Sequence, residues 1–246
     1  MTEIKKINYL KFFIITFVFS GILLISGNFE NSIGAGFNLD IILKILFIVA
    51  LLFYIYKKDE IETLTNVNIP ILYLLAAFIP TVMSILLTAC PFDLTVGTDA
   101  IVLTIAGTLT TAIWEELYFR KVGCSLFEEE GKFKWYNIIF LAFTFSMAHS
   151  LNIFLNGTFA TLTQVVFTFG FGIFALALFI STKSIILTII AHFFMNSVSD
   201  FYSLFASQEA SQILYCGDFY FLIYVVYVII LIVVGLGILR RNKLIH

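Results

Sequence analysis

The sequence is poor in charge and in cysteine. Only 12% of its 246 residues are charged, 61% are hydrophobic, and the mean hydropathy is +1.03. A soluble domain carries about 25% charged residues, so the composition excludes an ordinary one. The three cysteines, Cys90, Cys124 and Cys216, are too widely spaced for a CxxC motif or a disulfide framework. We therefore interpret them as small apolar residues of the protein interior.

Eight hydrophobic runs are long enough to cross a bilayer as helices. Each has about 18 to 23 residues, and a helix that rises 1.5 Å per residue needs roughly 20. The runs are continuously apolar rather than alternating, which disfavours a β-barrel. They lie at 10–27, 39–56, 69–91, 100–122, 136–154, 160–181, 184–206 and 219–239.

The runs predict an all-α polytopic membrane protein with about eight transmembrane helices. No internal repeat or soluble segment divides the chain, so residues 1–246 are expected to form one membrane domain, with a motif core at 100–206. Pro70, Pro80 and Pro91 lie in or beside the third run and predict a kink there.

Charged residues are distributed unequally between the two predicted sides of the membrane. If the N-terminus is cytoplasmic, the inner segments hold 13 of the 14 Lys and Arg residues, and only Lys44 is left over. The outer loops hold acids and no base, namely Glu30, Asp40, Asp93, Asp99, Asp200, Glu209 and Asp218. Lys and Arg are enriched in cytoplasmic loops, so both termini are predicted to be cytoplasmic.

Three of the eight hydrophobic runs contain a group of ionisable and amide side chains. A charged side chain at membrane depth costs about 3 kcal/mol or more, so such residues are rare and commonly functional. A single His or Asn can simply bond a neighbouring helix, whereas a group spread over three helices indicates a site. The group consists of Glu115, Glu116 and Arg120 in the fourth run, His149 in the fifth, and His192 and Asn196 in the seventh.

The spacing of these residues suggests separate roles. Glu116 and Arg120 are four apart on a helix and are predicted to form a supporting ion pair. Glu115 is rotated by about 100° from Glu116, which leaves it free for chemistry. His192 and Asn196 are also four apart and share a helix face.

This set of side chains fits the hydrolysis of a carbonyl compound held in the membrane. Glu115 and His149 would take a proton from water. His192 and Asn196 would stabilise the developing oxyanion.

Other readings of the same residues remain open. Glu115, His149 and His192 could instead hold a divalent metal such as zinc, although the HExxH motif of soluble zinc peptidases is absent. The sequence therefore leaves open whether there is a metal cofactor or none. A Ser or Cys nucleophile is disfavoured because none lies in a nucleophile–base motif. A small transporter is disfavoured because two related halves with broken helices are not found.

At these residues the sequence resembles the CAAX protease and bacteriocin-processing (CPBP or Abi) family of intramembrane endopeptidases, which includes the CAAX prenyl protease 2 type. The resemblance rests on three motifs in order, Glu115-Glu116-x-x-x-Arg120, Phe145-x-x-x-His149 and His192-x-x-x-Asn196, and covers only residues 115–196.

The resemblance implies an eight-helix fold whose catalytic cavity opens to the cytoplasmic side. It also implies that Glu115 and His149 activate water, that His192 and Asn196 stabilise the oxyanion or join a metal site, and that Glu116 and Arg120 support them.

We therefore expect an intramembrane endopeptidase of glutamic or metal type. Its expected substrate is a small peptide, a pheromone or bacteriocin precursor, or a lipid-anchored protein. The alternative is a non-proteolytic bacteriocin-immunity or regulatory protein of the same fold. The expected partners are the substrate and the lipid bilayer, without nucleic acid, and the expected location is the bacterial cytoplasmic membrane as a multi-pass protein.

For the proposed site to form, His149 and His192 must lie at the same depth in the membrane. At 1.5 Å per residue, His149 would lie about 20 Å from the inner interface, but His192 only about 12 Å. Tilt, a kink or a displaced boundary must bring the two histidines to one level.

Overall fold

A computed structural model describes residues 3–33, 38–58, 61–87, 96–129, 132–205 and 218–243. Within these ranges the regular elements are all helices, apart from one isolated bridge between Glu129 and Lys132. Seven helical segments are long and apolar enough to cross a membrane. The predicted all-α, polytopic membrane fold is therefore confirmed.

The seven long segments follow the predicted runs closely. Helix α1 spans Glu3–Ile33, and α2 spans Leu39–Lys57. The fourth run is one continuous helical stretch made of α6 (Thr98–Glu115), the π-helical segment η1 (Glu116–Val122) and α7 (Gly123–Phe127). The remaining segments are α8 (Trp135–Ala148) with the short helices η2 (His149–Asn152) and α9 (Ile153–Asn156), α10 (Thr158–Thr182), α11 (Ile185–Phe205) and α13 (Asp218–Arg241).

The third predicted run differs from the others, because it is split into α4 (Ile71–Ala77) and α5 (Ile79–Leu87), preceded by the short α3 (Glu62–Thr65). Its apolar helix, Ile71–Ile85, is too short to count among the seven, and residues 88–91 of the predicted run lie outside the described residues. The break at Phe78 lies two residues before Pro80, whose nitrogen has no hydrogen to donate to the helix ladder. The predicted kink is confirmed.

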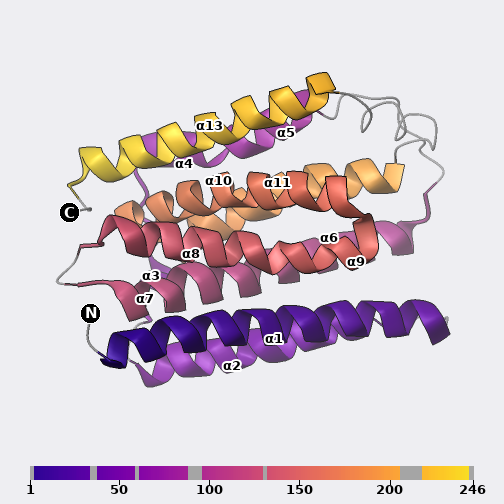
Figure 1. Cartoon of the computed structure of the whole chain (residues 1–246), viewed down its shortest axis with the longest axis horizontal. Coiled ribbons are helices and arrows are strands. Elements are labelled where there is room, and N and C mark those ends of the chain that lie inside the picture. Colours follow the sequence, from indigo (N-terminus) through magenta and orange to yellow (C-terminus); the bar gives the residue numbers. More distant parts are fainter. Residues whose placement is uncertain are drawn as a thin grey trace.

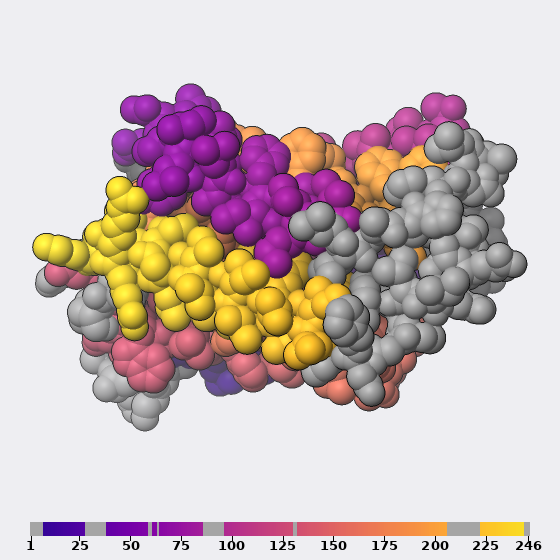
Figure 2. Space-filling model, turned by 90° about the horizontal axis from the view of Figure 1, so that it is seen from above, coloured from indigo at the N-terminus to yellow at the C-terminus, as the bar shows by residue number. Residues whose placement is uncertain are grey.

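Helix α10 is the central helix of the bundle and packs against α8 and α13 (Figure 1). Its close approach to α8 depends on Gly172, where a Cβ atom would lie 3.1 Å from the Cα atom of Ala142. Helices α1 and α2 form a layer on one face of the bundle (Figure 1). On the opposite face α13 lies beside α4 and α5 (Figure 2), where Tyr227 Oη donates a 2.6 Å hydrogen bond to the carbonyl of Pro80.

The start of α1 and the end of α13 lie at the same end of the bundle (Figure 1). Lys57, Lys183, Arg240 and Arg241 lie at this end, which we call the basic end. Asp40, Asp99 and Asp218 lie in the first turns of α2, α6 and α13, at the opposite or acidic end. The helices therefore alternate in the way that the predicted topology requires.

Candidate active site

His192 lies between the two adjacent carboxylates of the α6–η1 helix. Its Nδ1 atom is 2.7 Å from Oε1 of Glu116, and its Nε2 atom is 3.6 Å from Oε2 of Glu115. A carboxylate accepts hydrogen bonds, so Nδ1–H donates to Glu116. The 3.6 Å separation is an ion-pair distance and too long for a hydrogen bond. All three side chains are buried.

Glu115 and Glu116 reach the same imidazole ring because the helix changes its winding between them. A regular α-helix would rotate the two side chains about 100° apart, which is the spacing expected to leave Glu115 free for chemistry. Instead α6 ends at Glu115, the helix becomes π-helical at Glu116, and both acids reach the same ring. This is possible because the two nitrogens of an imidazole lie on opposite edges. Single π-helical turns occur frequently at functional sites.

The predicted pair between Glu116 and Arg120 is confirmed, with Nε of Arg120 3.1 Å from Oε2 of Glu116. The guanidinium is 1% exposed and lies over two rings, with its Cζ atom 4.3 Å from the centroid of Phe145 and 5.6 Å from that of Phe171. Among the described residues, none of its N–H groups has a hydrogen-bond partner of good geometry. Its charge is therefore balanced by one carboxylate and two aromatic faces.

His149 is positioned by the end of α8. Its Nδ1 atom lies 3.0 Å from the carbonyl oxygen of Phe145. A carbonyl can only accept, so Nδ1 carries the hydrogen and Nε2 of a neutral His149 keeps its lone pair. The Phe145 ring lies 5.1 Å from the His149 ring and 6.0 Å from the His192 ring, centroid to centroid. One phenylalanine thus contacts both imidazoles.

One cavity of about 920 Å³ is lined by all four predicted catalytic residues, Glu115, His149, His192 and Asn196. The depth condition is therefore met, because three helices bring the two histidines to the same cavity. Glu116 and Arg120 are buried behind this wall and are not among the lining residues. Because Glu116 and Arg120 do not reach the cavity, their location agrees with a role in supporting the residues that do.

The three candidate metal ligands do not form a metal centre. Within the described ranges, no three His, Cys, Asp or Glu side chains are grouped so that they could hold an ion. Both Nδ1 atoms are engaged, that of His149 with a backbone carbonyl and that of His192 with Glu116, so Nε2 of each ring is the atom left to meet a ligand. As placed here, the three side chains that were considered as metal ligands are not grouped to hold an ion, and the mechanism below uses no metal.

Asp200 was not predicted as a site residue, because its place near the end of the seventh run assigned it to an outer loop. Asp200 lies in α11, lines the cavity, and bonds the hydroxyl of Thr108 on α6. His192, Asn196 and Asp200 are spaced by four residues, and this spacing could have revealed the third one. Lys44, the base left over from the charge count, also lines the cavity and pairs with Asp40 at 2.8 Å.

The cavity extends from the catalytic residues towards the acidic end of the bundle. From Glu115 and His192 it extends to Asn156, beside the Gly157 turn between α9 and α10. The resemblance implied a cavity opening to the cytoplasmic side, where both termini were also predicted. Most lining residues lie away from the termini, whereas Glu115 and His192 lie in the parts of their helices that are nearer the basic end.

The fold and the site together define a multi-pass membrane protein with a buried Glu–His–Glu cluster at the wall of a cavity. Residues 97–198 match the family model of the type II CAAX prenyl endopeptidase Rce1-like proteins. The matched region contains all six predicted site residues and agrees with the family resemblance that the three motifs suggested. The match indicates an intramembrane protease. No curated protein and no solved structure matches the chain.

Proposed function

We propose that the protein is an intramembrane endopeptidase that hydrolyses a peptide bond in a small peptide, a pheromone or bacteriocin precursor, or a lipid-anchored substrate. The observation that carries this proposal is the position of His192 between Glu115 and Glu116, at the wall of a cavity shared with His149 and Asn196. So many ionisable groups at membrane depth are costly, and they commonly mark a functional site. Because the chain is small and its loops are short, the setting that we propose is the bacterial cytoplasmic membrane.

The charge balance of the cluster supports a donor role for His192. Two ionised carboxylates face one guanidinium, so a protonated His192 makes the cluster neutral. In an interior of low dielectric constant, a compensated cluster is favoured over one with an unpaired charge. An imidazolium that donates Nδ1–H to Glu116 still has Nε2–H available on the side of Glu115 and the cavity.

In the first proposed step, water attacks the carbonyl carbon of the scissile peptide bond. Glu115 takes a proton from this water, and the free Nε2 lone pair of His149 helps to orient it. The carbonyl oxygen becomes an oxyanion, which accepts hydrogen bonds from His192 and from the carboxamide of Asn196.

In the second proposed step, the tetrahedral intermediate collapses and the C–N bond breaks. Glu115 returns the proton to the leaving nitrogen, so that the products are a carboxylic acid and an amine. Glu116 and Arg120 touch no reacting atom in this scheme and act as positioning residues, because Glu116 fixes the His192 ring and Arg120 neutralises Glu116.

The test is cleavage of a peptide panel by the purified protein in proteoliposomes, read by mass spectrometry. The panel includes leader-type peptides and prenylated C-terminal peptides. Glu115→Gln and His149→Ala are expected to lower the cleavage rate by about 10²- to 10⁴-fold, which is the usual contribution of an acid or base. Glu62→Gln, at an exposed position near the basic end, is the matched control and should cleave at the wild-type rate.

Two outcomes would contradict the proposal. Undiminished cleavage by both Glu115→Gln and His149→Ala would remove these residues from the chemistry. Failure of the folded wild-type protein to cleave any peptide would favour the non-proteolytic immunity or regulatory function.

A further inference from the structure

Two uncharged carboxamides, those of Asn152 and Gln164, lie in the cavity wall beside the catalytic residues. Nδ2 of Asn152 donates a 2.8 Å hydrogen bond to Oε1 of Gln164, and this bond joins η2 to α10. Both side chains are half-buried, and both line the cavity that Glu115 and His149 also line. The two residues are 12 positions apart and come from two different hydrophobic runs.

The bond between the two carboxamides leaves one polar atom unused on each side chain. A carboxamide has one carbonyl oxygen and one NH2 group, so Oδ1 of Asn152 can still accept and Nε2 of Gln164 can still donate. Among the described residues, neither atom has a hydrogen-bond partner. Exchanging oxygen and nitrogen in both side chains would again leave one acceptor and one donor. The pair therefore offers one of each to the contents of the cavity.

A purely structural role would not require a carboxamide pair at this place. An amide group without a partner is costly in a membrane interior, where bulk water is absent. The same two hydrophobic runs are already joined by a smaller side chain, since Oγ of Ser146 donates a 2.6 Å hydrogen bond to the carbonyl of Val165. Neither Ser146 nor Val165 lines the cavity. The polar pair in the cavity wall thus points to a ligand that has amide groups of its own.

The position of Asn152 relates the pair to the catalytic histidine. Both residues belong to η2, a 3-10 helix that spans His149–Asn152, and residues three apart in such a helix lie on the same side. At about 2.0 Å per residue, Asn152 lies about 6 Å from His149 along the helix axis. An extended peptide rises about 3.3 Å per residue, so Asn152 is level with a residue about two positions from the bond to be cleaved.

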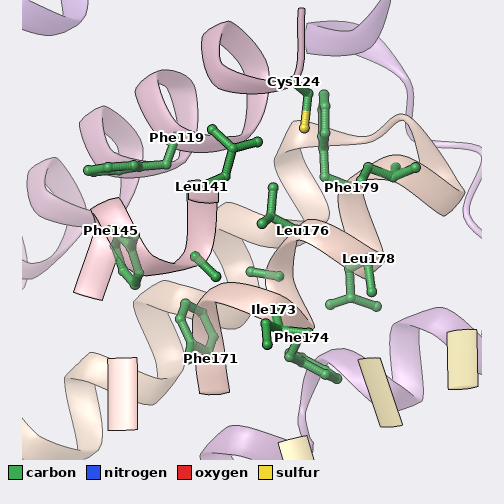
Figure 3. Packing of buried hydrophobic residues seen from close by; sticks show 14 of the residues in the cluster. Phe119, Cys124, Leu141, Phe145, Phe171, Ile173, Phe174, Leu176, Leu178 and Phe179 are labelled. Carbon is green, nitrogen blue, oxygen red and sulfur yellow. The ribbon is translucent and has the colours of Figure 1, made fainter. Parts of the chain in front are cut away.

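The interior next to the catalytic cluster is filled by packed side chains. Figure 3 shows buried residues from η1, α7, α8 and α10 packed against one another. Phe171 and Phe174 are 0% exposed and do not line the cavity. Cys124 lies buried in the same cluster, as predicted for this cysteine, whereas Cys90 and Cys216 lie outside the described residues. A peptide that reaches the catalytic groups therefore lies along the residues of the cavity wall.

We propose that Asn152 and Gln164 hold the main chain of the substrate peptide. A backbone N–H of the peptide donates to Oδ1 of Asn152, and a backbone carbonyl accepts from Nε2 of Gln164. Paired β-strands exchange hydrogen bonds in the same way, with one donor and one acceptor on each residue. Because every residue has these main-chain groups, the pair fixes an extended conformation without selecting a side chain. This inference rests on the proposed function only in taking a peptide as the occupant of the cavity.

The experiment measures peptide binding by fluorescence anisotropy in a Glu115→Gln background, so that binding is observed without cleavage. The probes are fluorescein-labelled leader-type and prenylated C-terminal peptides, the protein is held in nanodiscs, and empty nanodiscs give the binding to lipid. Asn152→Leu and Gln164→Met replace each carboxamide with an apolar side chain of similar size. Each is expected to weaken binding by about tenfold, the usual effect of leaving one hydrogen-bonding group without its partner.

The matched control is Ser146→Ala, which removes the bond from α8 to α10 outside the cavity wall. It is expected to bind the peptides as tightly as the background protein. If Asn152→Leu and Gln164→Met fold and also bind like the background protein, the inference is wrong. If none of the peptides binds to the background protein, the occupant of the cavity is not a peptide and the inference is wrong as well.

An ester scan of a bound peptide tests the main-chain contact directly. Replacing one backbone amide at a time with an ester removes one N–H donor and leaves every side chain unchanged. One ester, about two residues from the cleaved bond, is expected to weaken binding to the background protein by about tenfold. The same ester should have no further effect in Asn152→Leu, because its acceptor is already lost. If no single ester weakens binding to the background protein, the inference is wrong even where Asn152→Leu does not fold.

The combination of binding and cleavage separates this inference from the proposed function. Binding that depends on both carboxamides, together with no cleavage of any peptide by the wild-type protein, would leave the main-chain contact standing and overturn the protease assignment. Cleavage by the wild-type protein, with KM unchanged in both Asn152→Leu and Gln164→Met, would do the reverse.

Discussion

Nδ1 of His192 donates a 2.7 Å hydrogen bond to Oε1 of Glu116, although the two residues are 76 positions apart in the chain. Glu116 in turn lies 3.1 Å from Arg120, so the imidazole is linked through a carboxylate to a buried guanidinium. The opposite edge of the same ring faces Glu115 at 3.6 Å. This chain of contacts distinguishes the two adjacent acids, because Glu115 lines the cavity and Glu116 does not.

Replacing Glu116 with Gln is expected to reduce turnover without weakening substrate binding. Gln can still accept a hydrogen bond from Nδ1 but supplies no charge to balance an imidazolium. We expect kcat to fall by about 10- to 100-fold, as for partners that orient metal-bound histidines, with KM unchanged. Steady-state kinetics on any peptide that the wild-type protein cleaves measure both constants. A rise in KM at constant kcat would contradict a positioning role.

Replacing Arg120 with Gln is expected to destabilise the fold by about 3 kcal/mol, because it leaves the Glu116 charge buried without its partner. Thermal unfolding in detergent measures the loss. The matched control is Lys183→Gln, which breaks a half-exposed pair with Glu128 at a similar 3.1 Å distance. That pair should contribute less than about 1 kcal/mol.

The double variant Glu116→Gln/Arg120→Gln tests the cause of that loss. It removes both charges, so it is expected to be more stable than Arg120→Gln alone. If the double variant is the less stable of the two, the destabilisation does not come from an unpaired charge.

Replacing Thr108 with Val is expected to cost about 1–3 kcal/mol, because the partly buried carboxylate of Asp200 loses its hydroxyl partner. Thr104→Val is the control one turn earlier, since the Thr104 hydroxyl donates to the Ala100 carbonyl of its own helix and, among the described residues, to no other helix. Its effect should stay within about 0.5 kcal/mol. Equal unfolding midpoints for the two variants would show that the bond between Thr108 and Asp200 does not stabilise the fold.

Replacing Gly172 with Ala is expected to destabilise the bundle by about 1–3 kcal/mol, because α8 and α10 must move apart. The added Cβ atom would lie 3.1 Å from Cα of Ala142. Gly237→Ala, in α13, meets no atom within 4 Å and should instead stabilise its helix by about 0.5–1 kcal/mol. Thermal unfolding of the two variants side by side compares the close helix contact with the open site.

Removing divalent metal ions is expected to leave peptide cleavage unchanged, because the candidate ligands do not converge on one point. Dialysis against a chelator, followed by metal analysis and the cleavage assay, checks this expectation. Loss of activity that zinc restores would show that the site rearranges to bind a metal, and would overturn the scheme in which Glu115 and His149 act on water alone.

Sequence patterns were sufficient for features that depend on local spacing. The hydrophobic runs located seven long helices, Pro80 located the break between α4 and α5, and the four-residue spacing of Glu116 and Arg120 identified their ion pair. Each of these depends on a helix period or on the chemistry of one residue. The π-helical turn at Glu116–Val122 could not be recognised in this way, because its residues are ordinary helix formers.

The sequence by itself determined that this is a helical membrane protein, which residues lie at membrane depth, and which helix ends carry the positive charges. Hydropathy and charge act residue by residue, so they can be read without a fold. Only the tertiary structure decided that His192 lies between Glu115 and Glu116, and that a cavity extends from them towards the end of the bundle away from the termini. Both depend on how each helix is rotated and shifted against its neighbours. That rotation is set by the packing of residues such as Gly172 and Phe145 against other helices, which no local pattern specifies.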